Sequence, residues 1–115
     1  MEFRESKAIY LQIADLVCSA ILTGQWVVGD RVPSVREQAA LLTVNPATVM
    51  RGYDYLCTLG VITVQRGVGY EVAEGAREKI LAARREEFFT LELPSLKARM
   101  DELGIEIDEV IKKLF

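Results

Sequence analysis

Two signals for the start of a helix lie close together in the middle of the chain, and this spacing constrains the fold more than any other feature of the sequence. Ser34-Val35-Arg36-Glu37 has the form of a capping box, in which the serine oxygen accepts from the glutamate amide and the glutamate side chain reaches back to the serine amide. Asn45-Pro46 combines a preferred N-cap residue with proline at the first helical position. These signals predict helices over about 34–42 and 45–58, with a brief turn between them. Two helices joined by so tight a turn are typical of a helix-turn-helix.

The residues that follow predict a small β-hairpin. Val61-Ile62-Thr63-Val64 and Tyr70-Glu71-Val72 are rich in strand formers, and glycines lie between them where a hairpin must turn. A hairpin directly after a helix-turn-helix is called a wing. Before the two helices, residues 26–33 predict a loop with at most a very short strand, because proline imposes extended backbone on the residue before it. Apolar residues at helical spacing predict a further helix over about 8–23.

The last part of the chain changes to helix formers with dense charge. It predicts a helix over about 75–91 that is broken by Pro94, a second helix capped by Ser95 and ended by Gly104, and a short last helix from Ile107. Short amphipathic helices must cover their apolar faces. The same tail of a second subunit is the favoured cover, and packing on the winged part is the other option.

The chain has no histidine and two separate cysteines, which excludes several kinds of chemistry. Without histidine the commonest general base and the commonest metal ligand are missing, so Ser-His-Asp triads and histidine-based zinc sites cannot form. Cys18 and Cys57 do not form a C-x-x-C pair, and we interpret them as small apolar core residues in a reducing compartment. No apolar stretch reaches the ~20 residues that a bilayer needs, and the charged first residues do not resemble a signal peptide. We therefore expect a cytoplasmic protein with no membrane partner, no metal and no cofactor.

Four segments of the chain resemble a known family. They are Gly29-x-x-Val32-Pro33-Ser34-Val35-Arg36-Glu37-x-Ala39, then Val44-Asn45-Pro46-x-Thr48-Val49, then Leu56-x-x-x-Gly60-Val61-Ile62, then Arg66-Gly67-x-Gly69. In this order and spacing, over residues 8–73, they resemble the winged helix-turn-helix of the GntR family of bacterial transcription regulators. The short tail after Ala73, together with Asn45-Pro46, is similar to the YtrA subfamily.

The resemblance implies a fold that is mainly α with a small β-hairpin wing. It implies a winged helix-turn-helix DNA-binding domain over residues 1–73 and a helical dimerisation tail over residues 74–115. The function implied is a sequence-specific transcription regulator, most often a repressor, which binds an inverted-repeat operator in double-stranded DNA. It binds as a homodimer that forms through the C-terminal helices. In this subfamily the regulated genes are often those of an ABC transporter in the same operon. So short a tail leaves little room for an enclosed pocket for a small-molecule effector.

The net charge of -3 is unexpected for a DNA-binding protein, but the charge is unevenly distributed. Residues 31–66 hold four arginines against Glu37 and Asp54, whereas residues 74–115 hold 8 basic and 10 acidic residues. The acidity therefore lies largely outside the predicted DNA face. A dimer doubles the basic footprint that releases counterions from DNA.

The second helix of a helix-turn-helix enters the major groove with its N-terminal residues at the base edges. Ala47 and Thr48 are short enough to approach a thymine methyl group or a phosphate. Asn45 can combine capping with a phosphate contact, and Arg51 is a further candidate for the groove or the backbone.

The first helix of the motif and the wing supply the other predicted contacts. Arg36 occupies the position at which the family uses an arginine to read guanine, and a bidentate guanidinium is the commonest specific partner of guanine. Ser34 and the helix N-terminus that it caps are predicted to hold a phosphate. Arg66 and Gly67 at the tip of the wing are predicted to enter the minor groove, where arginine favours narrow, A·T-rich DNA.

The chain departs from the family at two positions of the second helix. The family often carries arginine in place of Pro46 and of Met50, so two base-reading arginines are missing here. Arg51 can supply one charge from the adjacent position, but the helical offset of ~100° per residue directs it elsewhere. The operator sequence of other family members therefore does not transfer to this chain.

Two other classes of function compete with a DNA-binding regulator. A winged helix can serve as a protein-interaction adaptor without a DNA target, but the arginines on both helix and wing would then lack a reason. An enzyme is the third class, and no group of residues in the sequence resembles a catalytic constellation.

Overall fold

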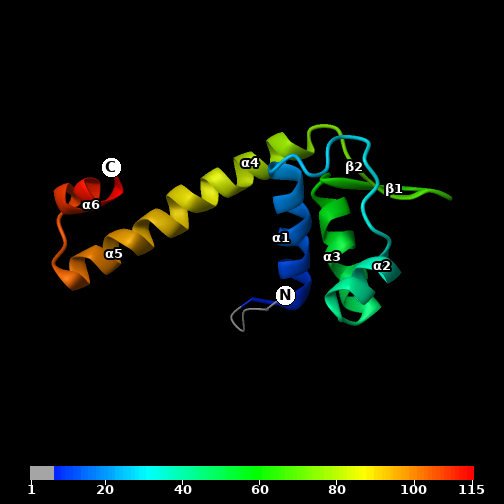
Figure 1. The fold of residues 1–115 in the computed structure, drawn as a ribbon, viewed down its shortest axis with the longest axis horizontal. Coiled ribbons are helices and arrows are strands. Elements are labelled where there is room, and N and C mark those ends of the chain that lie inside the picture. The colour runs from blue at the N-terminus through cyan, green and yellow to red at the C-terminus, as the bar shows by residue number, and fades with distance from the viewer. Residues whose placement is uncertain (1–6) are drawn as a thin grey trace. The chain divides into compact units, whose positions relative to one another are not determined.

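The computed structural model describes residues 7–115, which form two compact units (Figure 1). The first unit ends at Leu81, and the second runs from Ala82 to Phe115. The elements in chain order are α1 (Ile9–Leu22), α2 (Val35–Leu42), α3 (Pro46–Thr58), β1 (Ile62–Gln65), β2 (Gly69–Val72), α4 (Ala76–Glu87), the π-helical turn η1 (Phe88–Glu92), α5 (Leu93–Leu103) and α6 (Ile107–Leu114). The predicted fold class, mainly α with a small hairpin wing, is confirmed.

The core of the first unit is formed by residues from its helices and its hairpin. α1 and α3 lie side by side in Figure 1, and α2 packs against α3. The buried side chains of the helices follow the helical repeat that the sequence shows, and they join those of the hairpin and the loops in one apolar cluster. Its members are Ile13, Ala14, Val17, Ile21, Val32, Ala39, Val49, Tyr53, Leu56, Val61, Ile62, Val72, Ala76 and Ile80. Burial of these faces is what holds the helix-turn-helix and the hairpin as one unit.

α1 approaches α3 closely at Gly52, which is buried. A Cβ atom at this position would lie 2.8 Å from the carbonyl oxygen of Tyr10, a distance that real Cβ atoms do not adopt. Because that neighbour is backbone, a methyl group at residue 52 has to push the two helices apart.

Gly52→Ala is therefore expected to lower the free energy of unfolding by about 1–3 kcal/mol, as overpacking does, although alanine is the better helix former. Urea denaturation of the full chain measures this change. Thr58→Ala, at an exposed position of the same helix, serves as the control and should stay within about 0.5 kcal/mol of wild type. A Gly52→Ala protein as stable as wild type would contradict the close approach.

The hairpin has an antiparallel register in which Ile62 pairs with Val72 and Gln65 with Gly69. The segment before α2 extends this sheet by a single bridge between Arg31 and Glu71. The predicted loop with at most a very short strand is thus confirmed for this segment. The bridge ties the entry to α2 to the base of the wing.

The first turns of α4 belong to the packing of the first unit. Ala76 and Ile80 are buried in its core, and Lys79 Nζ donates to the carbonyl oxygen of Gly60 at 3.3 Å. The functional division at residues 73 and 74 stays a prediction.

The predicted break at Pro94 is wrong, because the helical backbone continues from α4 through η1 into α5. In η1 the amide of Leu93 donates to the carbonyl of Phe88, five residues earlier. In a regular α-helix the proline ring collides with the carbonyl four residues before it, and the π turn widens the helix at this place. Pro94 itself falls in the first turn of α5, where its missing amide hydrogen is tolerated. Ser95 consequently lies inside α5 and is not an N-cap. The predicted end of this helix at Gly104, which has left-handed backbone (φ 67), is confirmed.

Most apolar side chains of the second unit are exposed to solvent. Met100 is its one buried residue. The large apolar residues exposed in this unit are Phe88, Phe89, Leu91, Leu93, Leu96, Leu103, Ile107, Ile111, Leu114 and Phe115. An open, apolar-lined groove of about 370 Å³ runs between α5 and α6 and has Leu96 and Val110 in its lining. The second unit thus presents a large apolar surface that its own residues do not cover.

Among the described residues Cys18 and Cys57 are not joined by a disulfide, and both pack against the core of the first unit, as predicted. Burial, and next the carboxylate of Asp54, raise the pKa of the Cys57 thiol. This cysteine therefore stays protonated at neutral pH and behaves as a small apolar residue. Within residues 7–115 no helix is both long and apolar enough to cross a bilayer.

Candidate nucleic-acid interface

The two helices of the motif are joined by a turn that local hydrogen bonds close. At the start of α2, the Glu37 amide donates to Ser34 Oγ at 3.1 Å and the Ser34 amide donates to Glu37 Oε1 at 3.2 Å, which confirms the predicted capping box. At the end of α2, Thr43 adopts left-handed backbone with φ 56 and ψ 50. The Val44 amide then donates to the Ala39 carbonyl at 3.1 Å. These bonds fix the direction in which the chain leaves α2.

The N-terminus of α3 is capped by Asn45, as the sequence predicts. Its Oδ1 accepts from the Ala47 amide at 2.8 Å, and its carbonyl accepts from the Thr48 amide at 3.0 Å. Ala47 is exposed, Thr48 is half-buried and Val49 is buried in the core. The side-chain oxygen of Asn45 is thus used by the cap, while its amide group remains able to donate to a phosphate.

The first turn of α2 carries a pair of opposite charges beside the predicted reader of guanine. Arg36 is exposed there. The backbone amide of Ser34, and next its side chain, hold the pKa of the Glu37 carboxyl below its ordinary value, so this group is an anion at neutral pH. Arg31 Nη2 lies 3.9 Å from Glu37 Oε1. Arg31 therefore partly offsets the negative charge of Glu37 beside Arg36.

Arg51 lies on the side of α3 that faces α1. Its guanidinium carbon is 4.0 Å from the centroid of the Tyr10 ring, a cation–π contact, and the Tyr10 ring packs edge-on against Tyr55 with 6.2 Å between centroids. An open groove of about 380 Å³ at this place is lined by Ala8, Ile9, Tyr10, Ala47, Thr48 and Arg51. The direction of Arg51 is thus set by a residue of α1.

The tip of the wing holds the two remaining predicted contacts. Arg66 and Gly67 are exposed in the turn between β1 and β2. Gly67 has φ 80, a left-handed conformation that glycine adopts without strain and that a hairpin turn requires here.

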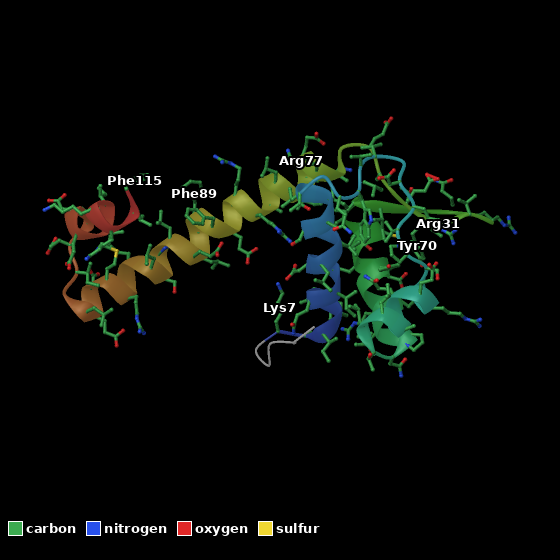
Figure 2. All side chains as sticks on the ribbon, viewed as in Figure 1. Lys7, Arg31, Tyr70, Arg77, Phe89 and Phe115 are labelled. Atoms are coloured by element: carbon green, nitrogen blue, oxygen red, sulfur yellow. The ribbon has the colours of Figure 1, made fainter. Side chains whose placement is uncertain are left out.

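A buried tyrosine of α3 connects the three parts of the motif. Tyr53 is fully buried, and its hydroxyl donates to the carbonyl oxygen of Pro33 at 2.7 Å. Burial raises the pKa of this phenol, which therefore remains a protonated donor. The ring of Tyr70, which Figure 2 labels on β2, packs edge-on against Tyr53 with 4.9 Å between centroids. The Tyr70 hydroxyl lies 3.5 Å from Met50 Sδ. The segment before α2, α3 and the wing consequently share one set of contacts.

The residues predicted from the sequence lie on three surface segments of the first unit. The segments are the N-terminus of α2 (Ser34, Arg36), the first turns of α3 (Asn45, Ala47, Thr48, Arg51) and the tip of the wing (Arg66, Gly67). The first two segments belong to helices that pack against each other. Sequence reasoning missed Tyr10 and Tyr70, which touch this surface from α1 and β2, because contacts between distant parts of the chain leave no local signal.

A helix-turn-helix followed by a hairpin defines a winged helix-turn-helix protein, a class that reads DNA with its second helix. Residues 9–72 match the family described as bacterial regulatory proteins, gntR family. The chain is 35% identical over 111 residues to the HTH-type transcriptional regulator YhcF of Bacillus subtilis, covering 96% of this chain and 90% of that protein. It is 36% identical over 81 residues to the HTH-type transcriptional repressor YtrA of the same organism, covering 70% of this chain and 62% of that protein. A solved GntR family transcriptional regulator from Listeria monocytogenes is 32% identical with a TM-score of 0.80, over 97% of this chain and 96% of that one.

The chain belongs to the GntR family, is similar to YtrA within it, and is a DNA-binding transcriptional regulator. Its relatives and its fold are those of transcription regulators rather than enzymes.

Proposed function

We propose that this protein is a transcriptional repressor that binds an inverted-repeat operator as a homodimer. The observation that carries the proposal is the pairing of two surfaces in one chain: a reading surface on α2 and α3, and an uncovered apolar surface on the second unit. YtrA of Bacillus subtilis, to which the chain is similar, is a transcriptional repressor. We further propose that the protein acts in the cytoplasm. The resemblance to the YtrA subfamily supports control of an ABC transporter operon.

The base contacts in this proposal come from the first turns of the two helices. Arg36 reads a guanine with its exposed guanidinium. Ala47 and Thr48, at the start of α3, approach a thymine methyl group or a phosphate. Arg51, held against Tyr10, contacts the groove or the backbone on the α1 side of the helix.

The phosphate and minor-groove contacts fix the register of the protein on the duplex. Ser34 and Asn45 each use a side-chain oxygen for a helix cap and keep a donor for phosphate. Arg66 and Gly67 enter the adjacent minor groove at the tip of the wing.

The apolar surface of the second unit supports the dimer. On α6, Ile107, Ile111 and Leu114 recur at helical spacing, and all three are exposed. Large exposed apolar patches mark sites of protein association, and a second copy of the same tail offers a self-complementary cover for this one.

The proposal predicts salt-sensitive binding of two chains to one duplex with half-sites about one helical turn apart. The full chain is used to select duplexes from a randomised pool, and fluorescence anisotropy measures its affinity for the selected duplex. Between 50 and 200 mM salt the affinity is expected to fall about 10³-fold or more, because basic side chains release counterions from the phosphates. A scrambled duplex is the control, and analytical ultracentrifugation gives the stoichiometry.

Salt-insensitive binding, or a complex with a single chain, would contradict the proposal. In vitro transcription from a promoter that carries the selected site tests repression separately. The transcript is expected to decrease as the protein saturates the site.

A further inference from the structure

The recognition helix exposes a thioether close to its N-terminus. On α3 the buried positions Val49, Gly52, Tyr53 and Leu56 face the core. Met50 lies between Val49 and Gly52 in the sequence, but its side chain is on the solvent side of the helix and is 42% exposed. It follows Ala47 by three residues, so the two side chains are neighbours on the surface of the helix. The other large exposed apolar residues of α3 and its C-cap are Tyr55 and Leu59, which lie at the C-terminal end of the helix.

Met50 is held from the side by the wing. The hydroxyl of Tyr70 lies 3.5 Å from Met50 Sδ, and the Tyr70 ring is itself packed edge-on against the buried Tyr53. A methionine side chain is flexible, so a fixed partner at its sulfur restricts its direction. The thioether of Met50 is therefore positioned although it is partly exposed.

We propose that Met50 reads the C5-methyl group of a thymine in the major groove, with Tyr70 as a positioning residue. The proposal rests on the DNA-binding function proposed above. The thymine methyl is the apolar group on the base edges of the major groove, and the other groups there are hydrogen-bond donors and acceptors. A thioether that covered those polar groups would remove their water without replacing its hydrogen bonds.

The rest of α3 agrees with this assignment. Arg51 is the one basic residue of the helix, and its guanidinium stacks on Tyr10, on the α1 side. The side of α3 that carries Met50 faces the wing instead. The carboxylate of Asp54 lies one turn further along the same side. This side of α3 has no cation of its own with which to read guanine.

The experiment replaces thymine by deoxyuridine, which removes the methyl group and leaves the hydrogen-bonding edge unchanged. A duplex selected by the full-length protein is made with each thymine replaced in turn, and anisotropy measures the affinity. Wild type is expected to bind about fourfold less tightly at one thymine in each half-site, the effect of burying a methyl-sized group. Met50→Ala is expected to bind the duplex with thymine and the duplex with deoxyuridine at this position equally. Met50→Leu is expected to keep the preference for thymine.

Two further variants separate a contact from a structural effect. Leu59→Ala removes a side chain of similar exposure at the C-cap of α3 and should keep full discrimination. Tyr70→Phe removes the hydroxyl at the sulfur but keeps the ring on Tyr53, so it should reduce the discrimination without lowering the thermal midpoint.

If Met50→Ala keeps the full wild-type loss of affinity at every thymine where wild type is sensitive, the inference is overturned. A wild type that is insensitive to deoxyuridine at every thymine would overturn it as well. Both results leave DNA binding intact. A wild type that selects no duplex would instead overturn the proposed function, and the reading of thymine with it.

Discussion

Arg36→Ala is expected to weaken binding to the selected operator by about 1–3 kcal/mol per half-site, because the guanidinium is the proposed partner of a guanine. The residue is exposed on the first turn of α2, so its removal leaves the core unchanged. In a dimer the loss occurs at both half-sites, which makes this the largest effect that we expect on recognition. Anisotropy with operator and scrambled duplexes measures it.

Arg36→Lys separates the charge of this residue from its geometry. Lysine keeps the positive charge but lacks the planar fork that binds guanine at two atoms. The salt dependence should therefore stay close to wild type while the ratio of operator to scrambled affinity falls. Arg99→Ala, at an exposed position of α5 in the second unit, is the matched control and should bind the operator as wild type does. Equal operator affinity in Arg36→Ala and wild type would exclude the proposed contact.

Tyr53→Ala is expected to have the largest effect on stability, a loss of about 3–5 kcal/mol in the free energy of unfolding. The side chain is fully buried, packs against Tyr70 and donates to the carbonyl of Pro33. Natural domains are stable by only about 5–15 kcal/mol, so this single change removes a large part of the total. Urea denaturation followed by circular dichroism measures it.

Tyr53→Phe isolates the hydroxyl from the ring. It keeps the apolar packing but leaves the Pro33 carbonyl without its donor, at an expected loss of about 1–3 kcal/mol. Tyr55→Ala, two residues later and 40% exposed, should cost clearly less than Tyr53→Ala. A small effect of Tyr53→Ala would mean that the contacts of this side chain do not support the fold.

Elements that depend on short-range chemistry could be predicted from the sequence. The capping box at Ser34 and the cap at Asn45 require only the residues within the next turn, and both helices begin where those signals place them. The hairpin is equally local, since β-rich runs and turn glycines are adjacent in the chain. The predicted contact residues lie on the surface for the same reason: they occupy the first turns and the tip that these signals define.

Other features could not be predicted because they depend on distant residues or on an uncommon backbone. Thr43 is β-branched and gives no signal for left-handed conformation, which the closure of the turn imposes on it. Proline normally ends a helix, and nothing in the sequence around Pro94 indicates that a π turn will accommodate it. The stacking of Arg51 on Tyr10 joins α3 to α1, and it appears only when the two helices pack.

The hydrogen bond from Tyr53 to Pro33 has a consequence for the thermodynamics of recognition. It anchors the peptide just before α2 to the middle of α3, so the segments that carry Arg36 and Ala47 are preorganised relative to each other. Binding to DNA then requires little additional ordering of the backbone in this part of the protein, and the entropic penalty of association is correspondingly small. Adaptation to the duplex is left to the exposed side chains and to the tip of the wing.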